Sequence, residues 1–159
     1  MQADEGRPSV DDRRPNVMTR VGDWSDMYER ILIPTDGRES TERAIAEAIA
    51  LASEHGAELR ALYVVNSAAI APGVDFDDLE VIGRRAIEHV EELAADAGVD
   101  RVEGAVTRGL RHRAILQYAD ESDVDLIVIG RHRELDHLLR GSVSKRVASE
   151  APVPVLVVD

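Results

Sequence analysis

The sequence predicts an α/β fold, in which helices cover both faces of an open, doubly wound sheet of five parallel strands. Five short apolar runs alternate along the chain with four segments whose apolar residues repeat at helical spacing. Strict alternation of strand and helix is typical of parallel sheets. One run, residues 126–129 between Asp125 and Gly130, is apolar at every position, as expected of a central strand covered on both faces.

The first strand and helix have the clearest boundaries. Residues 30–34 form an apolar run, the Asp-Gly pair at 36–37 supplies a turn, and Ser40 is a good N-cap for a helix that begins at Thr41. Gly56 ends this helix. One face of the helix is apolar and comprises Ala44, Ile45, Ala48, Ile49 and Ala52.

Two further strand–helix units follow. We expect the second strand at 59–65 and a loop at 66–76. The helix after this loop ends at Gly98, and its apolar stripe comprises Leu79, Ile82, Ala86, Val90 and Leu93. Residues 102–106 alternate as a strand does, and the next helix is marked by Ala114, Ile115, Tyr118 and Ala119.

The last part of the chain holds a polar loop at 131–140 and then a helix that starts near the Gly-Ser pair at 141–142. A final strand runs from Val153 to Val158. Because Pro154 has no N–H to donate to a ladder, this strand starts at an edge of the sheet.

Ligands of such sheets bind beyond the C-terminal ends of the strands, where the strand order reverses. The loops at 34–40 and 130–144 are therefore the candidate binding positions. The sequence has no G-x-S-x-G elbow and no complete phosphate loop, and nothing in it pairs a nucleophile with a base. We therefore expect a binding module and not an enzyme.

Composition excludes several classes of function. Acidic residues outnumber basic ones by 31 to 19, for a net charge of −12, which argues against nucleic acid and anionic membranes as partners. No apolar run approaches the roughly 20 residues of a membrane span. The chain has no cysteine, so disulfides, thiolate catalysis and cysteine-based zinc sites are excluded.

The N-terminal segment differs from the rest of the chain. Residues 1–26 show neither strand nor helix periodicity, and we expect them to be a disordered extension of a domain at 27–159. Translation starts at Met1, Met18 or Met27, and the sequence leaves these three open. The segment has no apolar stretch of the kind found in secretory signals, so we expect a cytoplasmic protein.

The ordered elements resemble the universal stress protein family. The resemblance covers essentially all of 27–159 and rests on four segments in sequence, with Gly109 and Ile115 between the first and second. The segments are Ile31-Leu32-Ile33-Pro34-Thr35-Asp36-Gly37, Leu126-Ile127-Val128-Ile129-Gly130, Gly141-Ser142-Val143 and Pro152-Val153-Pro154-Val155-Leu156-Val157-Val158.

This resemblance implies a strand order of 3-2-1-4-5 and a homodimer that pairs through the last strand, from Val153 to Val158. It implies a small regulatory module of the stress response, and in many family members a bound ATP. An adenine-nucleotide α/β enzyme and a receiver-type phospho-acceptor domain are the alternatives from other classes. The enzyme needs an intact phosphate loop, and the receiver needs an acidic cluster after the first strand.

The family's nucleotide motif reads Gly, two residues, Gly, nine residues, then Gly-Ser or Gly-Thr. Here Gly130 fills its first position and Gly141 its last, but Arg133 replaces the second Gly and only seven residues separate it from Gly141. The family also usually has Pro where this chain has Arg111. These departures predict that ATP binds weakly or not at all. The alternative is a shortened loop that still binds ATP or AMP, in which the arginines of the loop favour AMP or another signalling nucleotide.

The resemblance implies a nucleotide site with the residues Pro34, Thr35, Asp36, Val64, Val65, Ile129, Gly130, Arg133, Gly141, Ser142 and Val143. Asp36 either accepts hydrogen bonds from a ribose or adenine, or caps its own turn. Gly141 and Ser142 either admit a phosphate at a helix N-terminus or form a plain N-cap.

Two charged sets in the loop at 131–140 have less specific patterns. Three arginines in it suit either an anion clamp or a solvated loop, and we favour the solvated loop for Arg131, Arg133 and Arg140. The spacing of His132 and His137 suits neither a helix face nor a strand face, so we expect no metal site.

The composition of the basic residues predicts that the stability of the protein depends on salt concentration. Eighteen of the 19 are Arg and only Lys145 is Lys, which indicates either adaptation to high salt or a GC-rich genome. At about 1 M salt the Debye length falls to about 3 Å, so repulsion within a chain of charge −12 is screened. We expect the melting temperature to rise steeply between dilute buffer and molar KCl, and less in sucrose of equal osmolality. A flat profile would exclude adaptation to high salt.

Overall fold

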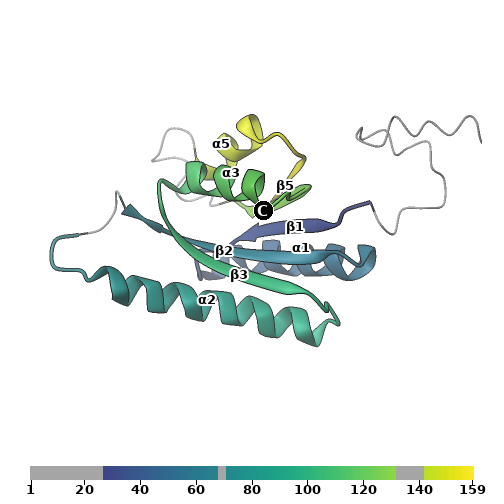
Figure 1. Ribbon diagram of the computed structural model, residues 1–159, viewed down its shortest axis with the longest axis horizontal. Coiled ribbons are helices and arrows are strands. Elements are labelled where there is room, and N and C mark those ends of the chain that lie inside the picture. The colour runs from purple at the N-terminus through teal and green to yellow at the C-terminus, as the bar shows by residue number, and fades with distance from the viewer. Residues whose placement is uncertain (1–26, 68–70, 132–141) are drawn as a thin grey trace, which may run out of the picture.

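Five parallel strands form a single sheet in the order β3-β2-β1-β4-β5, which confirms the predicted fold class and strand order (Figure 1). The computed structural model describes residues 27–67, 71–131 and 142–159. The strands are β1 (Arg30–Pro34), β2 (Glu58–Asn66), β3 (Val102–Gly109), β4 (Leu126–Gly130) and β5 (Val155–Val158).

Helices cover both faces of the sheet. α1 (Glu42–His55) and α2 (Phe76–Asp96) pack on one face, and α3 (Arg111–Glu121) and α5 (Val143–Glu150) pack on the other (Figure 1). A 3-10 turn, η4 (Glu39–Thr41), leads into α1. Within the described residues, no helix is both long enough and apolar enough to cross a membrane.

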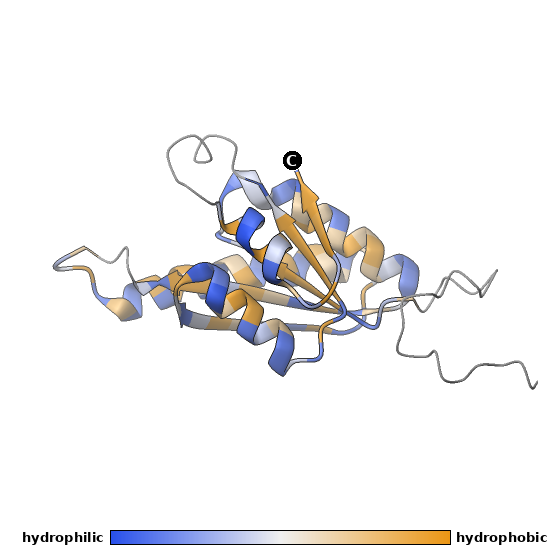
Figure 2. Cartoon of the chain, turned by 90° about the horizontal axis from the view of Figure 1, so that it is seen from above, coloured by the Kyte–Doolittle hydropathy of each residue, from blue (hydrophilic) through white to orange (hydrophobic). Residues whose placement is uncertain are grey.

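The central strands form the core. Ile31 and Ile33 of β1 face the layer of α1 and α2, whereas Leu32 between them faces α3 and α5, and all three are fully buried. Every residue of β4 is buried as well. Figure 2 shows the strands at the centre as largely apolar and the helices as amphipathic. The unbroken apolar run of β4 therefore has the cause predicted for it, which is cover on both faces.

The start of α1 corrects one expectation. Ser40 does not cap a helix from Thr41, because it lies inside the η4 turn and α1 begins one residue later, at Glu42. Thr41 occupies the N-cap position but makes no side-chain cap bond, because its hydroxyl donates to the Arg38 carbonyl at 2.8 Å.

Two strand boundaries also differ from expectation. β3 continues past Val106 to Gly109, because Thr107, Arg108 and Gly109 stay in register with the long strand β2. β5 begins at Val155 and not at Val153, although the Pro154 carbonyl already accepts a hydrogen bond from Ile127 N–H at 3.0 Å. Backbone pairing with β2 thus decided where β3 ends.

The expected apolar stripe of α2 was wrong at Ile82, which is 51% exposed. Gly83 faces the sheet in its place, so close to Tyr63 that a β-carbon there would lie 2.6 Å from the ring. The stripe that is buried comprises Gly83, Ala86, Ile87, Val90 and Ala94.

A ladder of ion pairs crosses the sheet near the N-terminal ends of its strands. Glu58 contacts Arg30 at 3.4 Å and Arg60 at 2.9 Å, and Arg60 contacts Glu103 at 2.9 Å. Burial lowers the pKa of Arg60, but a hydrogen bond to Tyr118 and the charge of Glu58 outweigh it and raise this pKa above its usual value. The guanidinium therefore stays charged, and the ladder joins β1, β2 and β3.

Candidate functional site

A hollow opens at the C-terminal ends of β1, β2 and β4. It measures about 470 Å³, including the part that is open to solvent. The described residues that line it are Pro34, Thr35, Asp36, Thr41, Leu62, Val64, Arg111, Ile115, Ile129, Gly130 and Val143.

The position of the hollow follows from the strand order. β2 is added on one side of β1 and β4 on the other, so the order reverses between β1 and β4. The loops that follow these two strands diverge, and a crevice remains between them. The first turns of α3 and α5 border the crevice through Arg111 and Val143. The hollow therefore lies where the sequence placed the candidate binding loops.

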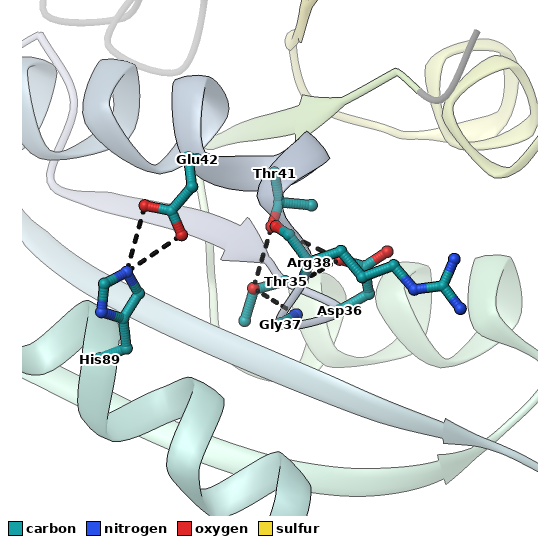
Figure 3. A network of polar contacts seen from close by, with 7 residues as sticks. All are labelled: Thr35, Asp36, Gly37, Arg38, Thr41, Glu42 and His89. Atoms are coloured by element: carbon teal, nitrogen blue, oxygen red, sulfur yellow. Dashed lines mark hydrogen bonds and ion pairs between the residues drawn. The ribbon is translucent and has the colours of Figure 1, made fainter. Parts of the chain in front are cut away.

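The loop after β1 forms one wall of the hollow and is held by hydrogen bonds among its own residues (Figure 3). Arg38 N–H donates to Asp36 Oδ1 at 2.9 Å, and Gly37 N–H donates to Thr35 Oγ1 at 3.1 Å. Gly37 has φ +76°, a conformation that glycine adopts without strain. Asp36 thus caps its own turn, as one of its two interpretations predicted.

Two buried threonine hydroxyls connect this loop to the start of α1. Thr41 Oγ1 lies 2.8 Å from the Arg38 carbonyl and 3.3 Å from Thr35 Oγ1. A hydroxyl has one proton, so Thr41 donates to the carbonyl and accepts from Thr35. Asp36 Oδ1 lies farther away, at 3.5 Å from Thr41 Oγ1. This pattern satisfies both hydroxyls and fixes the wall that Asp36 belongs to.

Behind the same loop a contact between a histidine and a carboxylate joins the two helices on this face of the sheet. His89 Nε2 of α2 lies 3.0 and 3.1 Å from the two carboxylate oxygens of Glu42, the first residue of α1 (Figure 3). Both side chains are exposed. The pair lies outside the hollow, and its role is to connect α1 with α2.

The opposite wall is formed by the end of β4 and the start of α5. A β-carbon at Gly130 would lie 3.4 Å from the Ser40 carbonyl oxygen, so the backbone of β4 ends in contact with the η4 turn. Ser142 caps α5, since its hydroxyl accepts from Lys145 N–H at 3.3 Å. The plain N-cap interpretation of Ser142 is thus observed.

Most of the residues that the sequence singled out meet at this hollow. Seven of them line it: Pro34, Thr35, Asp36, Val64, Ile129, Gly130 and Val143. Val65 is buried and does not line it, and Ser142 is adjacent as the cap of α5. Arg133 and Gly141 lie outside the described residues.

Sequence reasoning missed four lining residues, which are Thr41, Leu62, Arg111 and Ile115. Arg111 carried a signal, because it replaces the proline that the family usually has. Arg131 does not line the hollow, and it lies 3.7 Å from Asp159. Arg140, His132 and His137 are not among the described residues, which contain no cluster of metal-ligating side chains.

Comparison with known proteins decides the family. The sequence model of the universal stress protein family matches residues 27–159. The chain belongs to the universal stress protein family. One universal stress protein of Methanocaldococcus jannaschii is 33% identical over 155 residues, 90% of this chain and 88% of the relative. A relative from Thermus aquaticus is 36% identical over 138 residues, 83% of this chain and 99% of the relative.

Solved structures of universal stress proteins share the fold of this one. UspA from Lactobacillus plantarum is 27% identical, with a TM-score of 0.70 over 83% of this chain and 98% of that chain. A universal stress protein in complex with cAMP is 26% identical, with a TM-score of 0.70 over 83% of this chain and 97% of that chain.

The threonine pair predicts how the site loop of this universal stress protein responds to mutation. Thr41→Val keeps the shape of the side chain but removes the hydroxyl that bonds the Arg38 carbonyl and the Thr35 hydroxyl, which then keep only the backbone N–H donors of Thr41 and Gly37. We expect a loss of about 1–3 kcal/mol in the free energy of unfolding, measured by chemical denaturation.

Thr107→Val is the matched control. Thr107 makes no side-chain hydrogen bond within the described residues, and valine suits its position in β3. Equal stabilities for the two variants would show that the threonine pair does not hold the loop.

Proposed function

We propose that this universal stress protein is a regulatory module of the cytoplasm, without catalytic activity, that binds an adenine mononucleotide in the hollow and ATP only weakly. The observation that carries the proposal is the hollow itself. Its floor is apolar, its walls hold a carboxylate and a guanidinium, and it lies at the point where strand order reverses. Sites for small ligands commonly combine an apolar floor with a few polar groups.

The walls suit the parts of a nucleotide. Leu62, Val64 and Ile129 offer apolar contacts to a flat base. The carboxylate of Asp36 is an acceptor for ribose hydroxyls, and its turn already holds it at the wall. The universal stress protein solved with cAMP supports a mononucleotide as the ligand class.

The hydroxyls at the hollow do not favour an enzyme. Thr35 and Thr41 are buried and bond each other, and the Thr41 proton is used by the Arg38 carbonyl at 2.8 Å. A nucleophile needs a base in hydrogen-bond reach, and Asp36 lies 3.5 Å from Thr41 Oγ1. A binding module fits these contacts better than a hydrolase or a transferase.

The altered phosphate motif is the reason to expect weak ATP binding. Arg133 has a β-carbon where the family motif has glycine, and the segment up to Gly141 is two residues shorter. Loss of two hydrogen bonds to charged phosphate oxygens costs about 3–6 kcal/mol, or about two to four orders of magnitude in affinity. A mononucleotide does not depend on the full arc of that loop.

Calorimetry with AMP, cAMP and ATP in molar KCl tests the proposal. We expect one of the two monophosphates to bind at least tenfold more tightly than ATP. We also expect mass analysis to detect no ATP among the small molecules released when the purified protein is denatured. Low-micromolar ATP affinity, or ATP carried through purification, would contradict it.

A repaired loop sharpens this test. Arg133→Gly combined with two glycines inserted before Gly141 restores the family spacing, and we expect it to raise ATP affinity while leaving that of the monophosphate unchanged. Two glycines inserted beside Gly73, in the loop before α2, serve as the control for added chain length.

We also propose that two copies pair through β5. The Pro154 carbonyl accepts from Ile127 N–H of β4, and the Val158 carbonyl accepts from the N–H of Arg131, the residue after β4. Alternation along the strand therefore directs the backbone groups of Val155 and Val157 away from the sheet. Leu156 and Val157 are each 38% exposed. An apolar strand edge of this kind needs cover, and antiparallel pairing about a two-fold axis supplies it.

Val157→Pro removes an outward N–H and leaves the bonds to β4 in place. We expect light scattering at tens of micromolar protein to give a dimer for the natural sequence and a shift toward monomer for this variant. Circular dichroism serves as the control that the variant is folded. A monomeric natural protein would contradict pairing through β5.

A further inference from the structure

Arg111 is the one basic residue among the described residues that line the hollow. It is the first residue of α3, and it is half-buried. The loop from Leu110 into α3 places it at the rim, on the same helix as Ile115 of the apolar lining. A guanidinium here borders the space that a ligand would fill.

The guanidinium of Arg111 has no ion-pair or hydrogen-bond partner within the described residues. This differs from Arg60, which contacts Glu58 and Glu103 at 2.9 Å, and from Arg131, which contacts Asp159. In a chain with 31 acidic and 19 basic residues, carboxylates are abundant as partners. No carboxylate of the described residues therefore competes with a ligand for the charge of Arg111.

The described residues around Arg111 include no group that neutralises its charge. The first turn of α3 contains no acidic residue, and no side chain caps it. The unpaired N–H groups of that turn add a partial positive charge at the same place. Asp36 is the one carboxylate among the described residues that line the hollow, and it belongs to the wall formed by the loop after β1. The hollow thus has a negative and a positive group on different elements.

We propose that Arg111 determines the specificity of the hollow by binding the phosphate of a mononucleotide, so that nucleotides are selected over nucleosides. The inference rests on the proposed function. Asp36 repels a phosphate and accepts hydroxyl protons, so the ribose lies toward Asp36 and the phosphate toward Arg111. A guanidinium binds phosphate through two parallel hydrogen bonds. Arg111 thereby supplies an anion contact that the altered phosphate motif lacks.

Calorimetry with AMP and with adenosine, in molar KCl, tests this role. For Arg111→Ala we expect AMP affinity to fall about 10- to 100-fold and adenosine affinity to stay within about twofold of that of the natural protein. Arg111→Lys keeps the charge without the planar fork, so we expect it to recover part of the AMP affinity. Arg113→Ala, on the exposed side of the same turn, is the matched control and leaves both affinities unchanged.

The outcomes separate the two proposals. Natural protein that binds AMP, with Arg111→Ala binding it equally well, overturns the role of Arg111 and leaves the proposed function in place. Equal losses of AMP and adenosine affinity also overturn it, since they place the guanidinium on the base or the ribose and not on the phosphate. Natural protein that binds no nucleotide overturns the proposed function and this inference together. Circular dichroism spectra of each variant establish that losses do not reflect unfolding.

Discussion

The reversal of strand order between β1 and β4 is the constraint on which the site depends. Both strands are buried on both faces, so helices must cover each side and the chain must leave β1 and β4 in different directions. The two loops that follow diverge, and neither covers the space between them. Ile129 and Val64, which are core residues along their strands, become the floor of a hollow where those strands end.

The wall formed by the loop after β1 is held by hydrogen bonds among its own residues. The side chains in this wall form hydrogen bonds with one another or with the backbone of the same loop, as seen for Thr35, Asp36 and Thr41. These polar groups therefore have hydrogen-bond partners before a ligand binds. Because the wall is preformed, less conformational entropy of this loop is lost when a ligand binds. The geometry around Asp36 is therefore present before binding.

Charge is distributed unevenly over this acidic protein. The ladder of Arg30, Glu58, Arg60 and Glu103 alternates in sign, and its contacts of 2.9–3.4 Å are short enough to persist when longer-range interactions are screened. Arg111 stands apart at the other end of the strands, next to the positive end of α3. Local attraction for an anion can thus coexist with a net charge of −12.

The sequence by itself determined the elements whose signal lies within a few neighbouring residues. The apolar run of β4, the Asp-Gly turn after β1 and the buried face of α1 are all periodic or local patterns, and each is present in the structure. The resemblance to the family added the strand order. Together these features brought seven of the named site residues to one hollow.

Only the tertiary structure decided the features that depend on a distant partner. β3 extends to Gly109 because β2 lies beside it, and Gly83 replaces Ile82 on the buried face because Tyr63 occupies the space there. Arg111 borders the hollow because α3 packs over β2 and beside α5. Sequence periodicity reports which side of an element is apolar, but which residue meets a neighbouring element depends on packing between segments far apart in the chain.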